Sequence, residues 1–243
     1  MSQPAIACSD FYRRAARIAK AGLSAATLLV FSACAPPRDN SIVIGAKNFT
    51  EQVVLGELLA QQIEAVFASE GRPTEHVERR FYLAGSYLCH QALVTGRIDG
   101  YVEYSGTALT AILKQPLPAV KDPAAVFATV QSLYATRYKV RVEPGLGFED
   151  TFAVVVRGDD EKRLHLEKIS DLASHASAMR LWVGYEFQAR PDGLAGLQST
   201  YDLHFGTPRV MDLGLLYRAL ASNQVDVVAG NLTDGPILSL IHI

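Results

Sequence analysis

Cysteine, surplus positive charge and long apolar runs are all scarce in this sequence of 243 residues. The three cysteines cannot build a disulfide scaffold, and their spacing matches no zinc site. A formal net charge of −2 excludes the basic footprint of a nucleic-acid-binding protein. With 49% hydrophobic and 20% charged residues, the chain is too apolar and too weakly charged to be disordered. These absences leave a globular protein of one large domain or two modest ones.

The membrane candidate lies at the N-terminus, where an apolar run of about eleven residues covers Ala21 to Phe31. A membrane-spanning helix needs about 20 apolar residues, so this run is too short to cross a bilayer. Four basic residues precede it between positions 13 and 20, an order typical of a secretory signal. Phe31-Ser32-Ala33-Cys34 resembles a bacterial lipobox, in which the cysteine becomes the lipidated first residue. The alternative is an ordinary signal peptide with an incidental cysteine.

We therefore predict a lipoprotein-type signal peptide over residues 1–33, lipidation at Cys34 and a tether over residues 34–40. The protein is then exported and held by lipid at the periplasmic or cell-surface face of the cytoplasmic or outer membrane. The signal segment carries a net charge of +3, so its removal leaves the mature chain at −5. Cys89 is the remaining internal cysteine, which suits an oxidising compartment without disulfides, and we expect it to lie in the core.

The mature body alternates apolar strands with segments of helical spacing, which predicts an α/β protein with mostly parallel sheets. Thr50 is expected to cap the first helix, and Asp122 before Pro123 has the pattern of an N-cap followed by proline at the first helical position. The predicted strands cover residues 41–46, 77–83, 98–104, 152–157, 181–185 and 225–229. The predicted helices cover residues 51–69, 85–95, 106 onward, 122–137, 169–176, 194–201 and 211–222.

One unit of the chain recurs at a constant offset of 127 residues. Ile98-Asp99 precedes Tyr104 in the first copy, and Val225-Asp226 precedes Asn231 in the second. Each copy is predicted to be a helix, a tight turn and a strand that ends in a small polar loop. Two such units suggest two lobes of related build, whose loops face one cleft because ligands of α/β sheets lie at the carboxyl ends of strands. Coincidence among common α/β spacings is the alternative.

Catalytic and cofactor motifs are missing. The sequence has no G-x-S-x-G elbow, no Walker A motif and no dinucleotide-binding glycine motif after a strand. Its six histidines are scattered without ligand spacing, so we predict no metal site and no cofactor. Polar residues instead flank the predicted strands, and they are Lys47, Asn48, Tyr104, Thr107, Asp150, Glu186 and Arg190. A lysine, an arginine and a threonine hydroxyl can hold one carboxylate, whereas aromatic faces hold a quaternary ammonium by cation–π contact.

Several motifs, in order from about residue 41 to 235, resemble the substrate-binding proteins of glycine betaine/choline osmoprotectant ABC importers. The first reads IGAKNFTEQ over residues 44–52. The others are GSYLCHQAL at 85–93, GRIDGYVEYSGTAL at 96–109, LGFEDTF at 146–152, YEFQARPDGL at 185–194 and TDG at 233–235.

This resemblance implies a two-lobe, type II periplasmic-binding-protein-like fold that closes on an osmolyte, with lobe 1 over residues 41–147 and lobe 2 over 148–235. By matching motifs, Lys47, Thr107 and Arg190 fall where the family grips the ligand carboxylate. Tyr104 and Phe152 fall on walls of the aromatic cage. Asn231 falls where many members place a further cage tyrosine, and asparagine offers no π face.

The chain stops eight residues after Gly235, whereas family members cross back and complete the first lobe. We expect residues 236–243 to be a non-native tail, the C-terminal part of lobe 1 to be missing and the fold to be truncated. A genuine short tail is the alternative.

The sequence thus predicts a monomeric solute-binding protein, not an enzyme, that delivers a quaternary-ammonium or zwitterionic osmolyte to an ABC permease. A receptor for another small zwitterion or an amino-acid-like ligand is one alternative. A cleft enzyme is another, and turnover of a bound osmolyte would distinguish it.

Overall fold

The computed structural model describes residues 41–116, 122–239 and 241–242. The predicted signal peptide, tether and lipidation site at Cys34 lie outside the described residues. Residues Ile42–Ile243 form one compact unit, so the predicted lobe boundary near residue 147 stays a prediction. No helix within the described part of the chain combines the length and the apolar character that a membrane crossing requires.

The N-terminal half of the chain contains a small parallel sheet of β1 (Val43–Gly45) and β2 (Glu78–Arg80). The prediction of a third strand over 98–104 is wrong, because only a single bridge joins Ile44 to Gly100. The cause is a contact between distant residues: the Asp99 carboxylate, rather than a backbone carbonyl, accepts the Val43 N–H at 2.8 Å. A side chain that takes over a ladder donor prevents continuous pairing beside β1.

Four helical segments accompany this sheet. Helix α2 packs on β1 and β2 through Ala60 and Phe67. The N-cap of α2 is Phe49 rather than the predicted Thr50, and no side chain caps it. The prediction for Asp122 is confirmed, since its carboxylate accepts the Ala124 N–H at 3.0 Å. The segments are α2 (Thr50–Ser69), α3 (Ser86–Val94), α4 (Ser105–Thr107) continued by the π-helix η1 (Ala108–Ile112), and α5 (Pro123–Tyr138).

The C-terminal half contains a five-stranded sheet in the order β5-β4-β6-β3-β7. The predicted mostly parallel pairing is wrong here, because β4 pairs in parallel with β5 and β6, whereas β3 pairs antiparallel with β6 and β7. The register places Phe152 of β3 opposite Asn231 of β6. The strands are β3 (Phe152–Val156), β4 (Leu181–Val183), β5 (Arg209–Val210), β6 (Val227–Asn231) and β7 (Ile241–His242).

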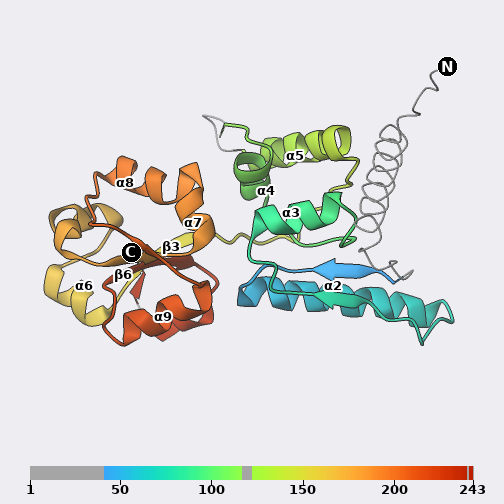
Figure 1. Cartoon of the computed structure of the whole chain (residues 1–243), viewed down its shortest axis with the longest axis horizontal. Coiled ribbons are helices and arrows are strands. Elements are labelled where there is room, and N and C mark those ends of the chain that lie inside the picture. The colour runs from blue at the N-terminus through green and yellow to red at the C-terminus, as the bar shows by residue number, and fades with distance from the viewer. Residues whose placement is uncertain (1–40, 117–121, 240, 243) are drawn as a thin grey trace, which may run out of the picture. The chain divides into compact units, whose positions relative to one another are not determined.

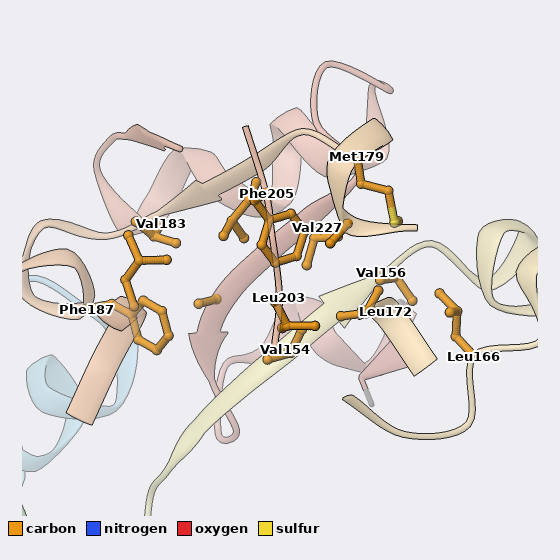
Figure 2. Close-up of a cluster of buried hydrophobic side chains, with 14 residues drawn as sticks. Val154, Val156, Leu166, Leu172, Met179, Val183, Phe187, Leu203, Phe205 and Val227 are labelled. Carbon is orange, nitrogen blue, oxygen red and sulfur yellow. The ribbon is translucent and has the colours of Figure 1, made fainter. Parts of the chain in front are cut away.

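Both faces of the strands β3 and β6 are buried, as near-continuous apolar strands require. Val154 and Val156 of β3 join one core cluster together with Val227 of β6, which Figure 2 shows beside Phe187, Leu203 and Phe205. The alternate residues Ala153, Val155 and Val228 join a second cluster. Helix α9 covers that second face, on the opposite side of the β3 and β6 strands from α7 and α8 (Figure 1).

The helices of the C-terminal half differ from prediction at the residues that matter for the site. The strand predicted to reach Tyr185 ends at Val183, and Tyr185 begins helix α7, so Arg190 follows a helix rather than a strand. The segments are α6 (Gly158–Leu164), η2 (Ile169–Ser174), η3 (Ala176–Ala178), α7 (Tyr185–Ala189), η4 (Pro191–Ala195), α8 (Gly196–Tyr201), α9 (Leu213–Ala221) and η5 (Gly235–Ser239).

The structure confirms the helix and the turn of the internal repeat in both copies, but the strand in the second copy alone. Helices α3 and α9 span residues 86–94 and 213–221, so both ends are separated by 127 residues. Each helix ends in a Schellman motif, in which Gly96 (φ 69°) or Asn223 (φ 61°) takes the left-handed position. After each turn an aspartate accepts the N–H that opens a strand segment: Asp99 from Val43 and Asp226 from Arg180.

Candidate ligand-binding site

Lys47 lies two residues beyond β1, and its side chain is buried. A buried ammonium requires a counter-charge, and its Nζ forms an ion pair with the Glu103 carboxylate. The same nitrogen lies 4.7 Å from the centroid of the Tyr104 ring. Lys47 is therefore a neighbour of Tyr104, and Glu103 supplies the negative charge that the Lys47 ammonium requires.

Glu103 is a residue that the sequence analysis missed. Besides Lys47, its Oε1 accepts the Tyr104 N–H at 2.8 Å and the Ser86 hydroxyl at 3.4 Å, and its Oε2 accepts the Tyr101 hydroxyl at 3.1 Å. The sequence did contain a signal for Glu103. A lysine directly after a buried strand needs a negatively charged partner, and Glu103 precedes Tyr104 in the motif over residues 96–109. With four donors the carboxylate is fixed in place.

Arg190 follows α7, and its side chain is 10% exposed. Its Nε and Nη2 donate in a fork to the two carboxylate oxygens of Asp192, at 2.9 and 2.7 Å. Its Nη1 donates to Thr107 Oγ1 at 2.7 Å and to Glu186 Oε1 at 3.4 Å. Burial opposes the charge of Arg190, yet the carboxylates of Asp192 and Glu186 raise its pKa. Arg190 and Thr107 are thus in contact, while the fork of the guanidinium is engaged by Asp192.

Glu186 of α7 sits at the N-terminus of α3. Its Oε2 accepts the Ser86 N–H at 3.1 Å, an orphan donor that the N-cap residue Gly85 cannot satisfy with a side chain. A Cβ at position 85 would lie 2.8 Å from this oxygen, so glycine permits the approach. Burial favours the neutral acid, but Lys47, the Ser86 N–H and Arg190 together hold the pKa of Glu186 below its usual value.

These contacts form one partly buried polar network, which we define as Lys47, Glu103, Ser86, Glu186 and Arg190. The path runs from the Lys47 ammonium through Glu103, Ser86 and Glu186 to the guanidinium. It joins the N-terminal half of the chain to the C-terminal half. The two cations predicted to grip one carboxylate are therefore linked through carboxylates of the protein itself.

Tyr104 carries a second set of polar contacts. Its hydroxyl donates to Glu51 and accepts from Gln52 Nε2 at 3.1 Å. Its ring stacks on Phe49 with centroids 6.4 Å apart. Burial, followed by the hydrogen bond to Glu51, raises the pKa of Tyr104 well above its usual range, so the phenol stays protonated.

Phe152 and Asn231 are cross-strand partners at one end of the β3–β6 pair. The Phe152 ring meets the Phe187 ring edge to face, with centroids 4.7 Å apart, and the Arg190 guanidinium carbon lies 5.2 Å from its centroid. Asn231 is 6% exposed, and its Nδ2 has no hydrogen-bond partner among the described residues. The protein's own cations thus occupy positions over both predicted cage rings, Tyr104 and Phe152.

Asp150 lies just before β3 and accepts the Thr233 N–H at 3.4 Å. Burial, followed by repulsion from Glu51, raises its pKa to about 6. The Thr233 bonds oppose this rise, and Asp234 adds to it. Asp150 and Glu51 therefore share an anionic region beside Tyr104.

Cys89 and His90 are two further candidate groups, and both lie on α3. Cys89 is fully buried, as predicted, and burial raises the pKa of its thiol to about 12. His90 is also buried, and it packs edge to face against Tyr134 and Tyr138. Within the described ranges no cluster of three or more metal-ligating side chains occurs. Two hollows of about 200 and 460 Å³ lie near Met179 and are lined by none of the predicted site residues.

Comparison with known proteins identifies the family. Residues 40–240 match OpuAC, the substrate binding domain of the ABC-type glycine betaine transport system. The chain is 31% identical over 216 residues to the carnitine transport binding protein OpuCC of Listeria monocytogenes, covering 86% of this chain and 68% of that protein. It is 30% identical to a glycine-betaine-binding protein of Pseudomonas aeruginosa, covering 79% and 62% of the two chains.

A longer relative and two solved structures are also similar. The ergothioneine transport permease/binding protein EgtU of Helicobacter pylori is 29% identical, and this chain spans 35% of its length. A crystal structure of a glycine betaine/carnitine/choline ABC transporter protein aligns with a TM-score of 0.59 at 30% identity, covering 84% of this chain and 74% of that one. Ligand-free YehZ of Escherichia coli aligns with a TM-score of 0.52 at 22% identity and supports the fold alone.

The fold is thus the α/β fold of type II periplasmic binding proteins. The chain belongs to the family of substrate-binding domains of ABC-type glycine betaine transport systems. Members of this family are extracytoplasmic binding proteins of importers, not enzymes.

Proposed function

We propose that this protein captures a small betaine-like zwitterion outside the cytoplasm and delivers it to an ABC permease. The observation that carries the proposal is the contact of Arg190 with Thr107, at 2.7 Å, between halves of the chain 83 residues apart. A guanidinium and a hydroxyl that meet in this way can share one carboxylate. Relatives named for carnitine and glycine betaine support this class of ligand.

Lys47, Tyr104, Thr107, Asp150, Phe152, Glu186, Arg190 and Asn231 form the proposed site. In the form described here Asp192 occupies the Arg190 fork. A ligand carboxylate therefore exchanges with a carboxylate of the protein rather than entering an empty cation site. In such an exchange one carboxylate replaces another, so Arg190 keeps a negatively charged partner when the ligand binds.

We further propose that the mature protein is a monomeric lipoprotein, held at the membrane through Cys34. The motif around Cys34 and the basic and apolar segments before it support this proposal. A lipid anchor would keep the binding protein close to its permease.

The test is calorimetric titration of the purified protein with glycine betaine, carnitine and choline, comparing Arg190→Lys with the parent. Lysine keeps the charge and loses the fork, so the two ligands that carry a carboxylate should bind about tenfold more weakly. Arg141→Lys is the matched control, since Arg141 is exposed and its ion pair among the described residues is with Glu143, which is exposed too. Choline has no carboxylate, and equal weakening of choline would contradict the assignment. Absence of binding by all three ligands would refute the proposed function.

A further inference from the structure

A hollow of about 460 Å³ opens at the end of the five-stranded sheet that lies opposite the proposed ligand site. The strands β5, β4 and β6 are parallel neighbours, so their N-terminal ends lie together. Arg180 directly precedes β4 and Arg209 begins β5, and both residues line the hollow. Asn231 of the proposed site ends β6, and Glu186 follows β4. The hollow and the ligand site are therefore at opposite ends of the same strands.

Every polar side chain that lines this hollow can donate a hydrogen bond, and none of them is a carboxylate. They are Ser177, Arg180, Thr207, Arg209 and Gln224. Apart from Arg180, none of them has a side-chain hydrogen bond or an ion pair among the residues that the structure describes. A set of charged and neutral donors of this kind matches the oxygens of an anion rather than a cation.

The arginines around the hollow outnumber the carboxylates that pair with them. One ion-pair cluster combines three arginines with two aspartates, namely Arg157, Arg163, Arg180, Asp160 and Asp226. This cluster keeps one positive charge in excess. Arg209 adds a second, because it pairs with no carboxylate of the described residues and lies instead 5.8 Å from the centroid of the Trp182 ring. The local excess of positive charge contrasts with the net charge of −2 of the whole chain.

Arg180 is held in place by the protein itself. Its Nε and Nη2 donate to the two carboxylate oxygens of Asp226, each at 2.8 Å, and Nη2 also donates to the Asn223 carbonyl at 2.9 Å. Its Nη1 makes no hydrogen bond within the described part of the chain, so this end of the guanidinium is available to a ligand. A side chain that is already ordered loses less conformational entropy when a ligand binds.

The hollow also has an apolar side, which is lined by Met179, Leu181 and Trp182. Met179 and Leu181 belong to the buried cluster of the sheet, and Figure 2 shows Met179 at its margin. A volume of about 460 Å³ lies within the range of small-molecule sites. The occupant that fits is therefore an anion that carries an organic group.

We propose that this hollow binds a phosphate ester. Arg180 and Arg209 contact the phosphate oxygens, and the hydroxyl groups of Ser177 and Thr207 complete the hydrogen bonds. A soluble organic phosphate and the headgroup of an anionic phospholipid present the same phosphate oxygens, so the chemistry of the site is shared by both sources. The proposal is independent of the proposed function, because it uses none of the residues of the ligand site.

The test has two arms, both at low ionic strength, where screening is weak. Calorimetric titration with glycerol 3-phosphate probes the soluble source. Cosedimentation with phosphatidylcholine vesicles, with and without phosphatidylglycerol, probes the headgroup, and it uses Cys34→Ser so that no acyl chain carries the protein to the bilayer. We expect saturable binding of glycerol 3-phosphate, or cosedimentation that requires phosphatidylglycerol, and the arm that responds identifies the source. Absence of binding in both arms would overturn the proposal.

Substitutions at Arg209 locate the binding, since this residue is exposed on a short strand and its loss leaves the core intact. Arg209→Ala should weaken binding about tenfold or more, because a charge-assisted hydrogen bond is removed, and Arg209→Glu should abolish it. Arg141→Ala is the matched control, because Arg141 is exposed and does not line the hollow. Binding by Arg209→Glu as tight as that of the parent would assign the anion to another surface and refute the proposal.

Discussion

Lys47 illustrates how one buried charge organises its surroundings at the scale of a residue. Its side chain is 2% exposed and that of Glu103 is 14% exposed, so neither is screened by water. Around this pair, Ser86, Tyr101 and the Tyr104 N–H complete the hydrogen bonds of the carboxylate. The desolvation of both charges is offset only while the whole set is present.

We predict that Glu103→Gln destabilises the protein by about 3–5 kcal/mol, because it leaves the Lys47 ammonium buried without a counter-charge. Urea unfolding measures the effect. Glu143→Gln is the control, since the Arg141–Glu143 pair is exposed and should contribute less than about 1 kcal/mol. Equal effects of the two substitutions would show that Lys47 is solvated.

Asp150 gives a pH dependence of known sign. Its pKa is about 6 in the folded protein against a usual 3.8, so the native state binds the extra proton between these values. Stability contributed by this group therefore falls as pH rises from about 4 to about 6. Burial and the negative charges of Glu51 and Asp234 raise the pKa of Asp150, whereas the hydrogen bonds that Thr233 donates lower it.

We predict that Asp150→Asn stabilises the ligand-free protein by roughly 1–2 kcal/mol at pH 7, after allowance for partial solvent screening. Denaturant unfolding at pH 3.5 and pH 7 tests this, because most of the difference should disappear at the lower pH, where the carboxyl is neutral in the folded state and mostly neutral in the unfolded state. A difference that is the same at both pH values would assign the effect to packing rather than to charge.

At the scale of elements, the sequence is most informative where local chemistry acts alone. Asp122 before Pro123 predicted the start of α5 correctly, because the cap bond involves neighbouring residues. The third strand is not formed because the side chain of Asp99, a residue of the predicted strand itself, accepts the N–H of the distant Val43. No local pattern distinguishes a strand from a bridged extended segment when the competitor is 56 residues away.

The site shows the same division between local and distant causes. The motifs predicted which residues are polar and lie near element ends, including Lys47 and Arg190. They did not predict the carboxylates that occupy these cations, because Glu103 and Asp192 have no distinctive spacing. Likewise, the position of Glu186 on α3 depends on the packing of α7, which tertiary contacts decide.

The repeated turns allow a reciprocal test at this scale. Gly96 and Asn223 occupy equivalent left-handed positions, φ 69° and 61°, and glycine adopts this conformation at no steric cost. We predict that Asn223→Gly stabilises the protein slightly, by up to about 1 kcal/mol, and that Gly96→Asn destabilises it by a similar amount. Thermal unfolding of both single variants measures this. Changes of the same sign would contradict the equivalence of the turns.

At the scale of the whole molecule, two contacts between the halves of the chain correspond to each other, because they lie at the N-termini of the two repeated helices, α3 and α9. Asn48 is the third residue after β1 and donates to the Asp212 carboxylate, at 3.3 Å, where Asp212 caps α9. Glu186 is the third residue after β4 and accepts from Ser86 at the start of α3. Each half thus contacts the helix N-terminus of the other from the same structural position.

Membrane attachment is predicted to depend on one atom, the sulfur of Cys34. Each buried CH₂ of an acyl chain contributes about 0.8 kcal/mol, so multiple chains anchor a protein almost irreversibly. Cys34→Ser should move the protein to the soluble fraction on cell fractionation while leaving the ligand affinity of the purified protein unchanged. Retention of the serine variant in the membrane fraction would refute lipid anchoring.

The buried thiol of Cys89 has a practical consequence. Thiol reagents attack the thiolate, and this sulfur is both inaccessible and deprotonated only at a pH of about 12. Its presence therefore does not complicate selective labelling of a cysteine introduced at an exposed position such as Tyr82, which is 71% exposed. A fluorophore can therefore be attached there without replacing the native core cysteine.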